Sequence, residues 1–230
     1  MNAHIFIDIT KLYHILEMKK PIIILILFLT CEFSFSQTYL TSHVIEKAES
    51  YLKQAVGDSL FKYFELGSNS YYEYKTKSGK SKWRDISKGK RTKGIFVNGK
   101  HINFILNHPD FQYPSIKKTV YVELDSNLNL LRDVYIDQIP KFLLRNEPSD
   151  WLTEKKLDSI IKTQDLKKSI EPINKRLEFD TKSKEYYWLV FNTLYKEKCF
   201  SDEEILHINP INGIILKRYE ERQRIMHCYE

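Results

Sequence analysis

Two stretches of the chain place apolar residues at the three-to-four-residue spacing of an amphipathic helix. The first covers residues 41–56, where Thr41 or Ser42 can cap the helix and Gly57 can end it. The second starts from an N-cap at Thr153 and continues to about residue 168. The apolar faces consist of Val44, Ile45, Ala48, Leu52, Ala55 and Val56 in the first helix, and of Leu157, Ile160 and Ile161 in the second.

Strand-like runs rich in aromatic and β-branched residues follow each helix, at 60–66 and at 185–195. Each half of the chain then ends in a predicted hairpin. The turn of the second hairpin contains Pro210, which presets φ, and Gly213, which accepts the left-handed conformation. The predicted hairpins are 119–124 with 130–136 around the turn 125–129, and 204–208 with 214–219 around the turn 209–213.

An offset of 84 residues places the two hairpins in register, so that Val122 meets Leu206 and Leu130 meets Ile214. Helix, strand and hairpin thus occur twice, which predicts an α+β fold of tandem helix-plus-antiparallel-sheet units. We expect the first unit at 37–145, with a β-hairpin insertion at 75–100, and the second at 146–230.

Residues of the second half carry a family resemblance. They are the capped helix start Leu152–Leu157, the aromatic strand Tyr186–Phe191 and the last hairpin Ile208–Leu216, whose turn has an Asn-x-x-x-Gly form. This stretch, about 151–220, resembles PepSY and PepSY-like domains; the match to 41–138 is weaker, since Asn129 stands where the turn glycine would be. The resemblance implies a small cystatin-like α+β module of exported bacterial proteins with inhibitory or peptide-binding roles, and it supplies no catalytic residues.

The expected insertion is strongly basic. Residues 75–100 contain eight Lys and two Arg against one acid, Asp85, a charge of +9 in a chain whose total is +6. Two hairpins are predicted here, one around residues 77–80 and one around Asn98-Gly99, a dipeptide typical of two-residue turns.

Clustered cations flanked by aromatic rings favour an anion-binding face. The candidate anion-binding residues are Lys82, Arg84, Lys88, Lys90, Arg91 and Lys93, and the candidate aromatic face consists of Tyr72, Tyr74, Trp83 and Trp188. The alternative is that the lysines keep exposed strand edges soluble and unpaired. In an exported protein we expect anionic lipid, acidic polysaccharide or an acidic protein as partner, and no nucleic acid.

Export is predicted from the N-terminal region. Met18-Lys-Lys is followed by the apolar run 21–30, which is the pattern of a secretory signal and is too short to span a membrane. Small residues at 34 and 36 predict cleavage after Ser36 and a periplasmic or secreted protein, and residues 1–17 are either a mis-assigned start or a removed extension. Acylation of Cys31 is an alternative, although Phe28-Leu-Thr before it fits a lipoprotein signal poorly.

Cys199 and Cys228 remain after cleavage, in a compartment that favours oxidation. Antiparallel pairing of the last two strands brings their ends to one edge, so a disulfide is the natural hypothesis. It would close a loop of about 30 residues and contribute roughly 3 to 4 kcal/mol. Two unpaired thiols are the alternative.

Candidates for catalysis are weak. His101 and His108 have no carboxylate at metal-ligand spacing, and a Cys199/His207 pair lacks both an orienting group and an oxyanion loop. We therefore expect a protein that is not an enzyme and needs no cofactor or metal.

Composition excludes a disordered or collagen-like chain, since 42% of the residues are apolar and 13% aromatic. We expect a binding or inhibitory module that recognises a peptide or protein at a sheet edge. The alternative is an envelope or surface-association protein that holds an anionic polymer or lipid through residues 75–100. The oligomeric state stays open.

Overall fold

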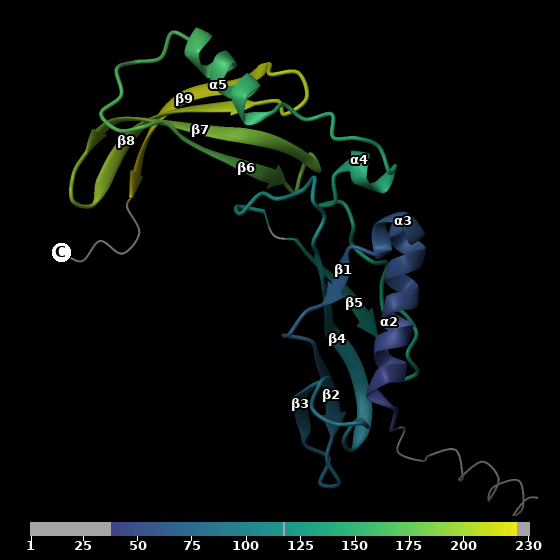
Figure 1. Cartoon of the computed structure of the whole chain (residues 1–230). Coiled ribbons are helices and arrows are strands. Elements are labelled where there is room, and N and C mark those ends of the chain that lie inside the picture. Colours follow the sequence, from purple (N-terminus) through teal and green to yellow (C-terminus); the bar gives the residue numbers. More distant parts are fainter. Residues whose placement is uncertain (1–37, 117, 225–230) are drawn as a thin grey trace, which may run out of the picture.

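The structure, a computed structural model, describes residues 38–116 and 118–224 and consists of two antiparallel sheets that follow one another along the chain (Figure 1). Between them lie short helices and irregular segments. In chain order the elements are α2 (Thr41–Val56), α3 (Asp58–Phe61), β1 (Phe64–Leu66), β2 (Tyr71–Lys75), β3 (Ser81–Asp85), β4 (Ile95–Leu106), β5 (Thr119–Leu124), α4 (Lys141–Leu144), α5 (Glu154–Thr163), β6 (Asn174–Asp180), β7 (Glu185–Lys196), β8 (Phe200–Ile208) and β9 (Ile215–Arg224).

The first sheet is organised around the long strand β4. One side of β4 pairs with β2 through its first half and with β1 through residues 104–106, and the other side pairs with β5. Strand β3 pairs with β2 and forms an edge of this sheet. α2 covers one face of the sheet, which leaves the opposite face, called here the outer face of the first sheet, without a helix (Figure 1).

The second sheet is a simple meander in the order β6-β7-β8-β9. α5 lies over one of its faces (Figure 1). Residues that alternate along β7 divide between the two faces: Tyr186, Trp188 and Val190 join the main hydrophobic cluster, and Leu189 and Phe191 form a smaller one with Ile205.

The two longest helices form where the apolar spacing predicts them. α2 buries Val44, Ala48, Leu52 and Val56 and ends at Gly57, whose φ is 80°. Its cap differs from the prediction: Leu40 is the N-cap and makes no side-chain bond, while the Thr41 hydroxyl donates to the carbonyl of Gly89 at 2.9 Å. In α5, Thr153 accepts a hydrogen bond from the Lys156 amide as expected, but the helix ends at Thr163.

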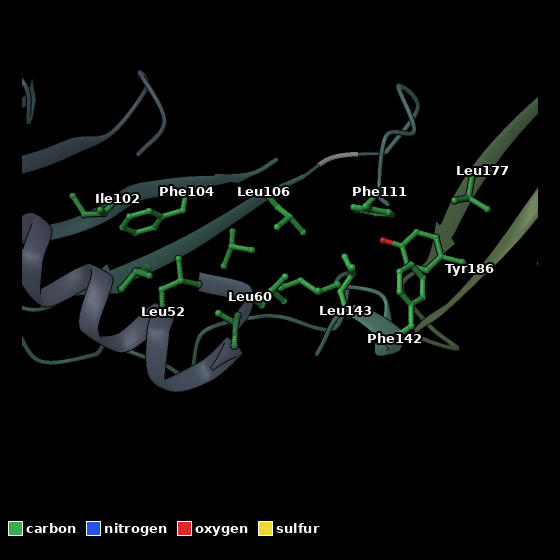
Figure 2. Packing of buried hydrophobic residues seen from close by; sticks show 14 of the residues in the cluster. Leu52, Leu60, Ile102, Phe104, Leu106, Phe111, Phe142, Leu143, Leu177 and Tyr186 are labelled. Atoms are coloured by element: carbon green, nitrogen blue, oxygen red, sulfur yellow. The ribbon is translucent and has the colours of Figure 1, made fainter. Parts of the chain in front are cut away.

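One hydrophobic cluster runs through both halves of the molecule. It starts between α2 and the first sheet and continues through Phe111 and Phe142 to Tyr186 on the second sheet (Figure 2). At the junction, Phe142 meets the Trp151 ring edge-on at 5.3 Å between centroids, and Trp151 lies 4.9 Å from Tyr186. The sheets are therefore joined by buried aromatic packing.

The expected fold class is wrong. The described residues are 18% helical and form nine strands in two sheets, so the protein is mainly β and not a tandem of helix-plus-sheet α+β units. The sheets also differ in topology, since the first has strands on both sides of a central β4 and the second is a meander. The fold class was wrong because pairing with a neighbouring strand makes strands that the local pattern does not show. Strand β6 pairs along all of its length with β7, in a segment where the sequence pattern indicated no strand.

Three smaller predictions in the first half are also corrected. Asn98-Gly99 does not form a turn: β4 continues through it, with irregular pairing on both sides. Residues 130–136 form no strand, and only a bridge between Leu124 and Leu130 remains of that hairpin. Much of the run 60–66 is occupied by α3 and a turn, and β1 begins at Phe64. The hairpins around 77–80 and 209–213 are confirmed.

The predicted signal region 1–36, including Cys31, lies outside the described residues, as does Cys228. Within the described residues no helix is long and apolar enough to cross a membrane. The proposed unit boundary at 145/146 stays a prediction.

Candidate functional site

The edge strand β3 divides its side chains between two chemically different faces. Side chains alternate across a strand, and Lys82 and Arg84 stand opposite Tyr74 and Tyr72, on the face turned toward α2. Trp83 stands opposite Glu73 and projects from the outer face. The cations and the exposed tryptophan therefore lie on opposite sides of one strand.

The outer face of the first sheet is concave and lined with aromatic rings. Two adjoining pockets of about 760 and 600 Å³ share His101, Thr119 and Tyr121. We call this surface the aromatic groove; its exposed rings are those of Tyr71, Trp83, His101, Tyr121 and Tyr135. Large apolar pockets with a few polar groups are the usual location of ligand sites.

Trp83 forms the β3 wall of the groove. Its ring meets His101 edge-on, with centroids 5.2 Å apart, and 49% of the residue surface is exposed. Of the three tryptophans in the chain, Trp188 is buried and Trp151 is half-buried, so Trp83 is the exposed one. An exposed indole next to a pocket offers a large apolar contact area at low entropic cost to a ligand.

One rim of the groove is held rigidly by hydrogen bonds around Asn103. The Ser70 hydroxyl donates to the Gly67 carbonyl at 2.8 Å, and the Asn103 side-chain amide donates to the Asn69 carbonyl at 2.9 Å. Gly67 leaves no room for a side chain, since an added Cβ would lie 1.7 Å from the Asn103 amide oxygen. The rim is thus ordered before any ligand arrives.

The opposite rim is the irregular segment 131–138, which covers both ends of the β5 edge. The Leu131 amide donates to the Glu123 carbonyl at 2.8 Å, and the Gln138 side chain donates to the Thr119 carbonyl. An ion pair between Arg132 and Glu123 strengthens this contact. A new strand would have to displace this segment to pair with β5.

The edge of β3 has no such cover. Within the described part of the chain β3 pairs only with β2, and Ser81, Lys82 and Trp83 are exposed. β9 is the corresponding edge of the second sheet, but its side chains are mainly charged and several are ion-paired.

Five of the six candidate anion-binding residues lie in or beside the loop that contacts the start of α2, and Lys82 lies on β3. The loop between β3 and β4 carries Lys88, Lys90, Arg91 and Lys93, all exposed. Arg84 reaches toward this loop, since an added Cβ on Gly89 would lie 3.4 Å from its guanidinium. None of the cations of residues 75–100 forms an ion pair with another described residue.

The predicted aromatic face is not formed as a unit. Tyr72 is fully buried, and its hydroxyl accepts a hydrogen bond from the Lys93 amide at 2.9 Å. Tyr74 is half-buried in the core, and Trp188 is buried beneath α5 in the other sheet. Trp83 alone of the four is exposed. Tyr121 and Tyr135 were missed, and alternation along 71–75 places Tyr71 on the other face of the sheet from Tyr72.

The cysteine and histidine candidates do not form a site. Cys199 precedes β8 and His207 lies near its other end, about 26 Å away along an extended strand. The His207 ring stacks on Tyr187 at 4.5 Å and 8°, and burial together with Lys217 lowers its pKa. Burial and Glu178 raise the pKa of Tyr187 to about 12. Among the described residues, no group of three His, Cys, Asp or Glu side chains is arranged to hold a metal. The disulfide of Cys199 with Cys228 stays a prediction.

Comparison of the chain with protein-family models, with curated proteins and with solved structures finds no match. The resemblance to PepSY-like domains therefore stays a prediction, and the features that bear on function are the groove and the β3 edge.

Proposed function

We propose that the protein is a non-enzymatic binding module that takes an extended peptide or protein segment as an additional strand along β3. The observation that carries this proposal is the uncovered β3 edge, which presents Trp83 on one face and Lys82 and Arg84 on the other. Strand addition provides backbone hydrogen bonds for affinity, and side chains alternate between the two faces for selectivity.

The two faces of β3 define the ligand chemistry. Every second ligand side chain would lie beside Trp83 at the aromatic groove, where apolar and aromatic groups bury surface. The side chains between them would lie beside Lys82 and Arg84, which have no ion-pair partner in the described part of the chain. The preferred segment therefore alternates apolar with acidic residues.

Synthetic peptides test this pattern directly. A short peptide alternating valine with glutamate should bind and change the fluorescence of Trp83, while a valine–lysine peptide should bind much more weakly. In the variant Lys82→Glu/Arg84→Glu the preference should reverse toward the lysine peptide. Trp83→Ala should weaken both, since one large apolar contact is worth roughly 1 to 3 kcal/mol.

Controls separate edge pairing from simple attraction. The double variant Lys155→Glu/Lys156→Glu makes the same charge change on the exposed surface of α5 and should leave the preference unchanged. A valine–glutamate peptide with N-methyl groups on the pairing side cannot donate to the β3 edge. If that peptide binds as well as the unmodified one, the strand-addition mechanism is wrong.

A further inference from the structure

The loop 86–94 is fastened to the first described residues of the chain. The amide of Tyr39 donates to the Thr92 hydroxyl and the amide of Thr92 to the Tyr39 carbonyl, both at 2.9 Å. The Thr41 amide donates to the Lys90 carbonyl at 3.1 Å, and Leu40 forms a bridge with Arg91. These bonds hold the loop at the place where the chain enters α2.

The side chains of this loop make one end of the molecule cationic. We call it the basic end; it consists of Lys88, Lys90, Arg91 and Lys93 in the loop, with Lys77 and Lys80 on the β2–β3 turn. Gly94 lies close to the Lys75 carbonyl, which brings the loop and the turn to the same end of the sheet (Figure 1). The carboxylate of Asp85, the one acid of residues 75–100, is engaged by the amide and hydroxyl of Ser87 at 2.8 and 2.7 Å.

The chain enters the fold at the same end. Cys31, which is the lipid-bearing residue if the chain is acylated there and not cut after Ser36, lies seven positions before Thr38, and seven extended residues span at most about 25 Å. Arg91 donates from its guanidinium to the Thr38 hydroxyl at 3.2 Å, so Thr38 itself belongs to the basic end. A lipid chain on Cys31 would therefore hold the basic end within about 25 Å of the membrane surface.

We propose that the basic end docks on an anionic lipid surface. A single apolar anchor gives marginal, reversible membrane association, and a cationic patch beside it makes the association stable. Each Lys or Arg near an anionic leaflet adds about 1 kcal/mol, and the exposed lysines of the loop have no ion-pair partner among the described residues that would cancel their charge. The position of the chain entry at this end favours a membrane over a free polyanion.

Docking in this way orients the rest of the protein. α2 and the first sheet extend away from the basic end, and the second sheet lies at their far end (Figure 1). The β3 edge is then presented beside the surface and the second sheet away from it. This inference uses other residues than the proposed peptide site, so either can fail alone.

Vesicle binding tests the proposal with the exported protein as it is recovered, with the same N-terminus in every variant. Binding to phosphatidylglycerol vesicles should exceed binding to phosphatidylcholine vesicles and should fall steeply as ionic strength rises. Replacing Lys88, Lys90 and Lys93 by Ser should lower the partition coefficient about a hundredfold, since each cation is worth roughly fivefold. Arg91 is left unchanged because it holds Thr38.

The matched control replaces Lys155, Lys156 and Lys162 of α5 by Ser, which removes the same charge from the second half and should leave vesicle binding unchanged. Circular dichroism establishes that both variants are folded. Equal binding to the two kinds of vesicle, equal loss in both variants, or retention on heparin without binding to phosphatidylglycerol would each overturn the proposal. The last outcome would identify an acidic polysaccharide as the ligand.

Discussion

The two sheets differ in how far their surface aromatic and charged side chains contact one another. In the second sheet the rings and charges largely satisfy one another: His207 stacks on Tyr187, Arg176 lies over the Phe191 ring at 4.7 Å, and Arg222 pairs with Asp202 at 2.8 Å. In the first sheet, Trp83 and Tyr121 line an open groove, and the cations of residues 75–100 form no ion pair with a described residue.

This difference supports the proposal that the first sheet is the half that binds other molecules. Surface groups that are already paired must lose those contacts before they bind anything else, whereas exposed rings and unpaired cations lose only water. Under the proposed function, the second sheet is a structural support and the first sheet is the binding surface. The shared hydrophobic cluster joins the support to the binding surface.

The largest effect is expected at the junction of the sheets. Phe142 is buried against Trp151, and Phe142→Ala should destabilise the protein by about 3 to 5 kcal/mol in denaturant unfolding. Because the cluster is continuous, both sheets should unfold in one transition. Phe200→Ala, at a residue that is 39% exposed, should cost less than about 0.5 kcal/mol. Two separate transitions in the wild-type protein would show that the halves are independent.

The next largest loss of stability is expected at Glu204 and not at its neighbour Glu203, which lies on the opposite face of β8. Glu204 accepts hydrogen bonds from the Asn192 amide at 2.8 Å and from Arg218 at 2.9 Å, so Glu204→Gln should cost about 2 to 3 kcal/mol. Glu203 is 8% exposed, and one of its oxygens has no hydrogen-bond partner among the described residues, so the neutral variant Glu203→Gln should not destabilise the protein. Equal losses in thermal unfolding would contradict the assignment.

Acid titration adds a second measurement on Glu204. Burial alone would raise the pKa of Glu204, but hydrogen bonds from Asn192 and Arg218 outweigh it and hold the pKa below its ordinary value. Its stabilising contribution is therefore present above about pH 4.3 and is lost as the pH falls through the lowered pKa. The Glu204→Gln variant should lack this part of the acid destabilisation seen in the wild-type protein.

A smaller loss of stability is expected when either of two turn glycines, one in each sheet, is replaced by alanine. Gly213 and Gly79 have φ values of 76° and 77°, so alanine is strained at both by about 1 kcal/mol. A Cβ on Gly213 would also lie 2.3 Å from the Ile160 side chain, whereas nothing lies within 4 Å at Gly79. Gly213→Ala should therefore cost about 1 to 2 kcal/mol more than Gly79→Ala in the same unfolding assay. Equal costs would mean that α5 moves away freely.

The smallest effect on stability is expected in the groove itself. Trp83→Ala should change the unfolding free energy by less than about 0.5 kcal/mol, because Trp83 lies outside the core. The same variant should remove most of the tryptophan fluorescence that iodide quenches in the folded protein. Strong iodide quenching that survives in Trp83→Ala would mean that Trp151 or Trp188 is accessible, and the contrast between the sheets would then be weaker than described.

The pattern of apolar positions predicted elements whose spacing and ends are local properties. α2, the Thr153 cap of α5 and the Gly213 turn follow from neighbours within a few residues of one another. The turn predicted at Asn98-Gly99 was wrong because two neighbouring strands, β2 and β5, pair with β4 on either side of this dipeptide and hold it extended. Strand β6 was missed because its mixed polar sequence becomes a strand only by pairing with β7.

The candidate site was predicted in part for the same reason. The basic character of residues 75–100 and the exposure of Trp83 could be expected from composition and from a local hairpin. The burial of Tyr72 in the core and the position of Trp83 in a groove could not be predicted. Side chains alternate between the two faces of a strand, but this alternation does not indicate which face α2 covers. His101 and Tyr121 join the groove only through the pairing of β4 with its neighbours.

By itself, the amino-acid sequence determined the buried face of α2, the Thr153 cap of α5, the place where charge gathers and the need for glycine at 213, since these depend on side chains a few positions apart. Only the tertiary structure decided that the protein is mainly β, that its two sheets differ in topology and that the tryptophan and the cations of β3 face opposite ways. Those properties depend on which strands pair across long stretches of chain and on which face of each sheet is buried, and burial is a property of the whole folded molecule.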